Sequence, residues 1–236
     1  MIGTAEPIFH DGTAEAGIDF HHFNGMSGKL YFAEVVGGGG ALFDADNDGD
    51  LDLYLVQGHM LGPYGVDKAL ISPRGPLSDR LYRNDLEVQP DGRRVLRFTD
   101  VTEKSGIDGG GYGMGVAAGD YDGDGWIDLY VTHLGANQLW RNRGGGAMTF
   151  EDVTAKAGVE ERRWSVPASF FDFDRDGHLD LWVGNYVDYS VAADKPCVGE
   201  SGLRDYCSPG SYEAVADRLF RNRGDGSFED VSEKSG

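Results

Sequence analysis

One acidic pattern, D-x-D-x-D-G-x-x-D, occurs three times in this chain of 236 residues. The aspartates at positions one, three, five and nine are Asp44, Asp46, Asp48 and Asp52 in the first copy, Asp120, Asp122, Asp124 and Asp128 in the second, and Asp172, Asp174, Asp176 and Asp180 in the third. Carboxylates at alternate positions of a tight loop direct their oxygens towards one point, and the glycine permits the sharp turn. Such oxygens repel one another unless a hard cation lies between them, and Ca²⁺ suits a flexible, oxygen-rich site. The pattern therefore predicts three calcium-binding loops.

The flanking residues separate these loops from an EF-hand, which has a Glu at loop position twelve and a helix on each side. Position twelve here is Leu55, Val131 or Val183, and the flanks alternate in the manner of strands. We therefore expect hairpin connections with metal ligands at positions one, three, five and nine. The backbone carbonyl of position seven would add a ligand, from Asp50, Trp126 or His178. The alternative is a set of Asp/Gly turns that hold no metal, since both residues favour turns.

The chain is strongly acidic, with a net charge of −19 from 40 acidic and 21 basic residues. Three bound Ca²⁺ ions would reduce this to about −13. The remaining negative charge argues against nucleic acid or an anionic membrane as a partner. No apolar run reaches the length of a membrane span.

The two cysteines, Cys197 and Cys207, lie in one polar stretch. We expect a disulfide between them, worth about 2–3 kcal/mol through the entropy of the unfolded chain. Two unpaired thiols in a reducing compartment are the alternative. A disulfide and calcium loops together point to an extracellular, cell-surface or periplasmic location.

Each acidic loop belongs to a larger unit of four predicted strands. A strand of small residues precedes the loop, one strand follows it, and then come an L-aromatic-R-N strand and an F-x-D-V-T strand. The last motif recurs after 52 residues, from Phe98 to Phe150. Self-similarity at this period predicts an all-β protein, a β-propeller of four-stranded blades.

The repeats predict that residues 1–236 form a single partial β-propeller. Residues 1–35 would be an outer strand and lead-in, because Phe9–Ile18 resembles the last strand of a unit. Three blades would follow, at 36–107 with an insertion at 59–78, at 108–159, and at 160–236 with an insertion at 187–216. Three blades do not close a ring of the usual four to eight, so we expect part of a longer propeller. Long insertions of this kind are usually functional or disordered.

These motifs resemble the FG-GAP/VCBS repeat superfamily, the calcium-loop propellers that include the integrin α-subunit head. The similarity is strongest to bacterial proteins related to cartilage acidic protein 1, which often carry an ASPIC/UnbV domain. Phe9–Gly25, Gly37–Gly40, Phe43–Gly49 and Tyr206–Pro209 carry it, and it covers essentially the whole chain. The resemblance implies a secreted or surface-exposed propeller of about seven blades with structural calcium, of which this chain would be an N-terminal portion.

The first functional hypothesis is a non-enzymatic, extracellular module that binds a protein or a glycan and could serve in cell adhesion. The sequence singles out no catalytic residue and no organic cofactor site. The alternative is a propeller enzyme acting on polysaccharide as a lyase or dehydratase, with candidate groups among His21, His22, His59 and His133. Arg223-Gly224-Asp225 matches an integrin-binding tripeptide, but we interpret it as the repeat's own hairpin turn.

Overall fold

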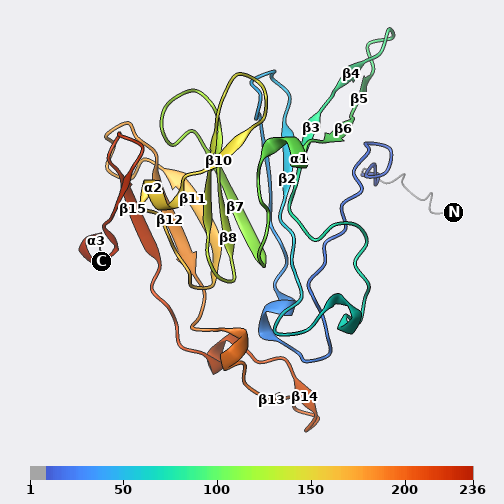
Figure 1. The fold of residues 1–236 in the computed structure, drawn as a ribbon, viewed down its shortest axis with the longest axis vertical. Helices are drawn as coiled ribbons and strands as arrows, with labels where there is room; N and C mark the ends of the chain where they lie inside the picture. Colours follow the sequence, from blue (N-terminus) through green and yellow to red (C-terminus); the bar gives the residue numbers. More distant parts are fainter. Residues whose placement is uncertain (1–8, 236) are drawn as a thin grey trace, which may run out of the picture.

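A computed structural model describes residues 9–235, which fold into three four-stranded antiparallel sheets side by side (Figure 1). The first sheet contains β1 (Gly40–Phe43), β2 (Asp52–Leu55), β3 (Arg80–Asn84) and β6 (Phe98–Asp100). The second contains β7 (Gly113–Gly119), β8 (Asp128–His133), β9 (Gln138–Asn142) and β10 (Phe150–Asp152). The third contains β11 (Ser165–Phe171), β12 (Asp180–Asn185), β15 (Arg218–Asn222) and β16 (Phe228–Asp230). The prediction of a mainly β protein with several antiparallel sheets is confirmed.

Short elements complete the description. One-turn helices follow the last strand of each sheet: α1 (Thr102–Ser105), α2 (Thr154–Ala157) and α3 (Ser232–Ser235). Two hairpins lie outside the sheets, β4 (Glu87–Val88) with β5 (Arg94–Val95), and β13 (Cys197–Val198) with β14 (Arg204–Asp205). Four 3₁₀ turns are η1 (Phe32–Val35), η2 (Val66–Lys68), η3 (Val191–Ala193) and η4 (Pro209–Ser211). The sequence analysis did not anticipate the β4–β5 hairpin, which projects beyond the first sheet (Figure 1).

Neighbouring sheets pack face to face, so the strands of the second sheet bury side chains on both of its faces. On β8, Leu129 packs in the core between the first and second sheets, whereas Tyr130 packs between the second and third. Both are 0% exposed. Strand side chains point alternately to the two faces, and here each face meets a neighbouring sheet. That explains why consecutive residues of β8, from Leu129 to Val131, are apolar and buried.

The first strands of the sheets run close together, with β7 between β1 and β11. A Cβ added at Gly115 would lie 2.3 Å from the carbonyl oxygen of Val166, and one at Gly39 would lie 2.8 Å from the Cα of Gly115. Larger side chains at these positions would force the sheets apart. The small residues of the first strand therefore permit the close approach of adjacent sheets.

The outer strand expected at Phe9–Ile18 is not formed, and the described residues before Gly40 contain no strand. The segment forms a turn instead, in which the Thr13 amide donates to the Asp11 carboxylate at 3.0 Å. A strand requires a neighbour, and residues 9–235 offer this segment none beyond one backbone bond from the Phe98 amide to the Ala16 carbonyl, at 2.7 Å. Residues 1–8 of the predicted 1–35 segment lie outside the described part.

The insertion at 187–216 is ordered by a disulfide and an aromatic cluster. Cys197 and Cys207 are bonded, with their Cα atoms 5.1 Å apart, which confirms that prediction. Phe32, in the lead-in, stacks on Tyr212 of the insertion with ring centroids 5.5 Å apart and meets Trp164 edge-on at 5.3 Å. The insertion is thus tied to the segment before the first sheet.

The acidic loops and the two insertions lie at opposite ends of the sheets (Figure 1). Each acidic loop joins the first strand of its sheet to the second, and each insertion joins the second strand to the third. In an antiparallel sheet these connections alternate between ends. Among residues 9–235, no helix has the length and apolar character needed to cross a membrane.

Candidate metal centre

Each of the three acidic loops brings carboxylate oxygens together at a single point. Three carboxylates in each loop place one oxygen apiece within 4.8 Å of the others. These groups are Asp44, Asp46 and Asp48 in the first loop, Asp120, Asp122 and Asp128 in the second, and Asp172, Asp174 and Asp180 in the third. Position nine joins the group in the second and third loops, and position five takes that place in the first.

The aspartate at position one organises each loop from inside. In the first loop its two oxygens accept the amides of Asp48 and Gly49, at 3.2 and 3.0 Å. The same pair of bonds forms at Asp120 and at Asp172. Gly49 has a φ of +92°, and the other two loop glycines adopt similar values. A side chain would strain this left-handed backbone, which explains the glycine at position six.

The aspartate at position nine is buried and fastens the loop to its sheet. Asp128 is 0% exposed, and its two oxygens accept the amides of Tyr121 and Asn142 at 3.1 and 2.8 Å. Asp52 makes the same pair of bonds. Burial raises the pKa of Asp52 to about 6 and that of Asp128 to about 8, and nearby loop carboxylates add to both increases.

The donor chemistry of the loops fits a hard divalent cation. All converging atoms are carboxylate oxygens, which Ca²⁺ prefers. In the first group, Oδ1 of Asp46 is buried and has no hydrogen-bond partner among the described residues. An unpaired buried carboxylate oxygen is costly, and a bound cation would satisfy it. The loop residues, with the carbonyls of Asp50, Trp126 and His178, would hold such an ion.

The R-N pair that ends the third strand acts on the loops, which the sequence analysis did not foresee. Arg141 donates to Asp122 and Asp124 at 2.5 and 2.8 Å. Arg221 does the same to Asp174 and Asp176, at 2.6 and 2.9 Å. The recurrence of R-N once in each unit was a visible signal, but the sequence did not show where the side chains point.

The asparagine of this pair links neighbouring loops. The Asn142 amide group, in the second sheet, donates to the carbonyl of Ala45 in the first loop at 2.8 Å. Asn222, in the third sheet, donates likewise to Tyr121 in the second loop at 2.7 Å. Both side chains are almost fully buried. The first and second loops are therefore each held by their own sheet and by the next.

Position seven lies beside the turn that follows the R-N pair. A Cβ added at Gly144 would lie 2.8 Å from the Trp126 indole nitrogen, and one at Gly224 would lie 2.6 Å from Nε2 of His178. Gly224 belongs to the Arg223–Asp225 tripeptide, which lies in the turn between β15 and β16. His178 is exposed.

The histidines considered for an enzymatic role do not form a compact site with other ligand groups. Clusters of three or more His, Cys, Asp or Glu within residues 9–235 occur only in the acidic loops. His133 is buried, and burial lowers its pKa to about 4. His21 and His22 are exposed, and His59 is partly buried.

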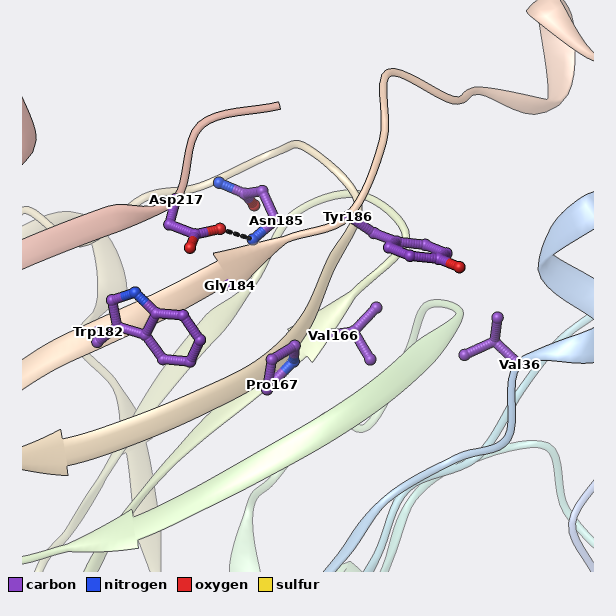
Figure 2. A pocket seen from close by; sticks show the side chains of 8 residues that line it. All are labelled: Val36, Val166, Pro167, Trp182, Gly184, Asn185, Tyr186 and Asp217. Atoms are coloured by element: carbon purple, nitrogen blue, oxygen red, sulfur yellow. Dashed lines mark hydrogen bonds between the residues drawn. The ribbon is translucent and has the colours of Figure 1, made fainter. Parts of the chain in front are cut away.

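A cavity of about 420 Å³ lies on the outer face of the third sheet, between Trp182, Pro167 and Tyr186 (Figure 2). Asp217 lines it and accepts the Asn185 amide at 2.9 Å. In the first sheet the counterpart of Asp217 is Asp79, whose carboxylate accepts a hydrogen bond from the Tyr54 hydroxyl at 2.7 Å. The segment that leads to the second sheet covers Asp79, and the Asp79 amide donates to the Gly109 carbonyl in that segment. The cavity thus corresponds to a space that the next segment fills elsewhere, and we assign it no ligand.

Comparisons with known proteins include a family profile that covers two of the loops. Residues 120–183 match the family profile of the FG-GAP-like repeat, a span from position one of the second loop to position twelve of the third. Cartilage acidic protein 1 from Homo sapiens is 31% identical over 134 residues, which are 56% of this chain and 20% of that protein. The Mus musculus protein of the same name is 30% identical over the same shares. The match thus spans about a fifth of the length of these curated relatives. The chain therefore contains an FG-GAP-like repeat and is distantly similar to cartilage acidic protein 1.

Proposed function

We propose that this chain is a calcium-stabilised β-propeller repeat module that binds a protein or a glycan outside the cytoplasm. The observation that carries the proposal is the threefold convergence of carboxylate oxygens in equivalent loops. The FG-GAP-like repeat supports it, because the profile match covers two of these loops. Each ion would neutralise carboxylates at the connection between two strands. The metal would then serve the scaffold, and the insertions at the other end would be free to contact a partner.

Chelation tests the metal part of the proposal. A ligand that binds only the native state at a hundred times its Kd adds about 2.7 kcal/mol per site, or about 5–10 °C in Tm for a chain of this size. We expect EGTA to lower Tm by at least this amount and Ca²⁺, but not equimolar Mg²⁺, to restore it. Asp120→Asn should reduce the effect of calcium. Asp91→Asn, at the exposed tip of the β4–β5 hairpin, is the matched control. An unchanged Tm in EGTA would contradict the proposal.

The binding role draws support from the insertion that carries the disulfide. It is held rigidly against the lead-in, yet the β13–β14 hairpin exposes Val198 at 65% and Leu203 at 71%. Exposed apolar side chains on a fixed element are typical of contact surfaces. Arrays of glycans and of secreted proteins, probed with calcium-loaded protein, test this role. We expect a signal that Leu203→Asp abolishes. No signal on either array, or one that this variant leaves intact, would contradict it.

A further inference from the structure

The three acidic loops differ in whether an arginine already occupies them. Arg141 and Arg221 each span the carboxylates at positions three and five of their loops. Arg83, the counterpart in the first sheet, turns away and pairs with Asp85 at 2.7 Å. Among residues 9–235, no arginine or lysine forms an ion pair with the carboxylates of the first loop.

A difference two residues after the arginine explains this contrast. The position that holds Asp85 in the first sheet holds Arg143 in the second and Arg223 in the third. Arg143 and Arg223 pair across the hairpin with Glu151 and Glu229, at 3.5 and 3.9 Å. In the first sheet Thr99 takes the place of those glutamates and donates to Asp85 at 2.5 Å. Asp85 thus forms an ion pair with Arg83. In the second and third sheets the same position is an arginine, which repels Arg141 or Arg221 and cannot pair with it.

Two further observations also separate the first loop from the second and third. The buried, unpaired loop oxygen, Oδ1 of Asp46, lies in the loop without an arginine. The position-five carboxylate belongs to the converging group only in that loop, as Asp48, whereas Arg141 and Arg221 hold Asp124 and Asp176. The first loop also has a fifth aspartate, Asp50. It therefore combines the highest negative charge with carboxylates that form no ion pair with any described arginine or lysine.

We propose that Asp85 makes the first loop the tightest calcium site of the three, and that Arg141 and Arg221 act as built-in cations that weaken binding in the second and third loops. A metal ion that enters those loops competes with a guanidinium for two carboxylates. In the first loop the metal ion neutralises carboxylates that no guanidinium pairs with. As calcium falls, the second and third loops release it first, and their arginines keep the carboxylates neutralised. This inference rests on the proposed calcium function.

Exchanging the pairs between sheets tests the inference by calorimetric calcium titration. An exposed ion pair corresponds to a change in affinity of up to about fivefold. The wild type should show one tight site and two weaker ones. Asp85→Arg with Thr99→Glu should weaken the tight site by this factor. Asp91→Asn, on the same hairpin, makes the same net change in charge and should leave it unchanged.

The reverse exchange reports on the second loop alone. Trp126 lies in that loop at position seven, where the other loops have Asp50 and His178, so its excitation sensitises terbium bound there. Arg143→Asp with Glu151→Thr should draw Arg141 away and raise terbium affinity in this loop by up to about fivefold. Arg141→Gln should act in the same direction.

The outcomes separate the two proposals. Absence of any calcium or terbium binding refutes the proposed function and this inference with it. Binding to three sites of equal affinity refutes the inference alone. Binding constants that stay unchanged in both exchange variants, with circular dichroism showing folded protein, refute it as well.

Discussion

At the scale of single residues, buried polar side chains carry the connections between the sheets. Asn142 satisfies three backbone groups: the carbonyls of Ala45 and Ile127 and the amide of Gly144. Asn84, its counterpart in the first sheet, donates only to Leu51 in its own loop, and its carbonyl oxygen has no partner among the described residues. The same residue type therefore contributes differently in two repeats.

This contrast yields a matched pair of variants. Asn142→Ala leaves buried backbone groups unpaired and should cost about 2–3 kcal/mol of unfolding free energy, whereas Asn84→Ala should cost about 1 kcal/mol. Urea denaturation measures both. Equal losses would contradict the role of Asn142 in linking the loops.

A second residue-scale prediction concerns acid stability. Burial lowers the pKa of His133 from its ordinary value of 6.5 to about 4, so the native state binds this proton less readily than the unfolded chain. The unfolding free energy that depends on neutral His133 is fully present above pH 6.5. It is lost as pH falls from 6.5 towards 4, and the loss amounts to about 3 kcal/mol. His133→Gln, which copies Gln57 at the same place in the first sheet, should remove this loss.

The measurement is the difference in Tm between wild type and variant from pH 7 to pH 4. Other groups titrate in this range in both proteins, so the difference isolates His133. His10→Gln, at an exposed position, is the control. Parallel pH curves for wild type and His133→Gln would show that the histidine does not titrate as expected.

At the scale of elements, the lead-in and the disulfide-bonded insertion form one unit. Phe32 of η1 contacts aromatic rings of Trp164, Tyr189 and Tyr212 and is 4% exposed. The contacts with Tyr189 and Tyr212 join segments more than 150 residues apart in sequence. Removing this ring should therefore release the insertion as well as destabilise the core.

Phe32→Ala should cost about 3–5 kcal/mol, as expected for a large buried ring. Limited proteolysis should also cut residues 187–216 faster than in the wild type, while the disulfide keeps the fragments together until reduction. Leu203→Ala, in the same insertion but exposed, should alter neither property. If Phe32→Ala destabilises the fold without exposing the insertion to protease, the two elements are not coupled.

At the scale of the whole molecule, the third sheet presents an apolar face that the first two sheets bury. Phe171 and Phe173 are 41% and 37% exposed. Their counterparts in the first sheet, Phe43 and Ala45, are 4% and 0% exposed because the second sheet covers them. Exposed apolar faces of this kind favour association.

We expect the 236-residue chain to self-associate in a concentration-dependent manner. Replacing Phe171 and Phe173 together by Lys should shift sedimentation towards the monomer with little loss of stability, since both rings are already partly solvated. Leu70→Lys is the control, because Leu70 is 64% exposed at the opposite end of the sheets. Unchanged sedimentation in the double variant would place the association elsewhere.

The sequence by itself determined the repeated elements. The acidic pattern located the three loops, and period-two apolar segments located the strands beside them, because both signals are local and recur. The prediction of an outer strand at Phe9–Ile18 was wrong for the described residues, since a strand depends on a partner that the motif alone does not supply. The disulfide was predictable because the chain has only two cysteines.

Only the tertiary structure decided what the repeats do to one another. Asn142 reaching the first loop, Phe32 reaching the insertion, and Arg83 turning to Asp85 while Arg141 and Arg221 turn to the loops all depend on side-chain direction across long separations. Three loops with nearly identical sequences therefore differ in the charged side chains that surround them. Local patterns encode backbone geometry, whereas the field at each loop is set by charges that folding brings near it.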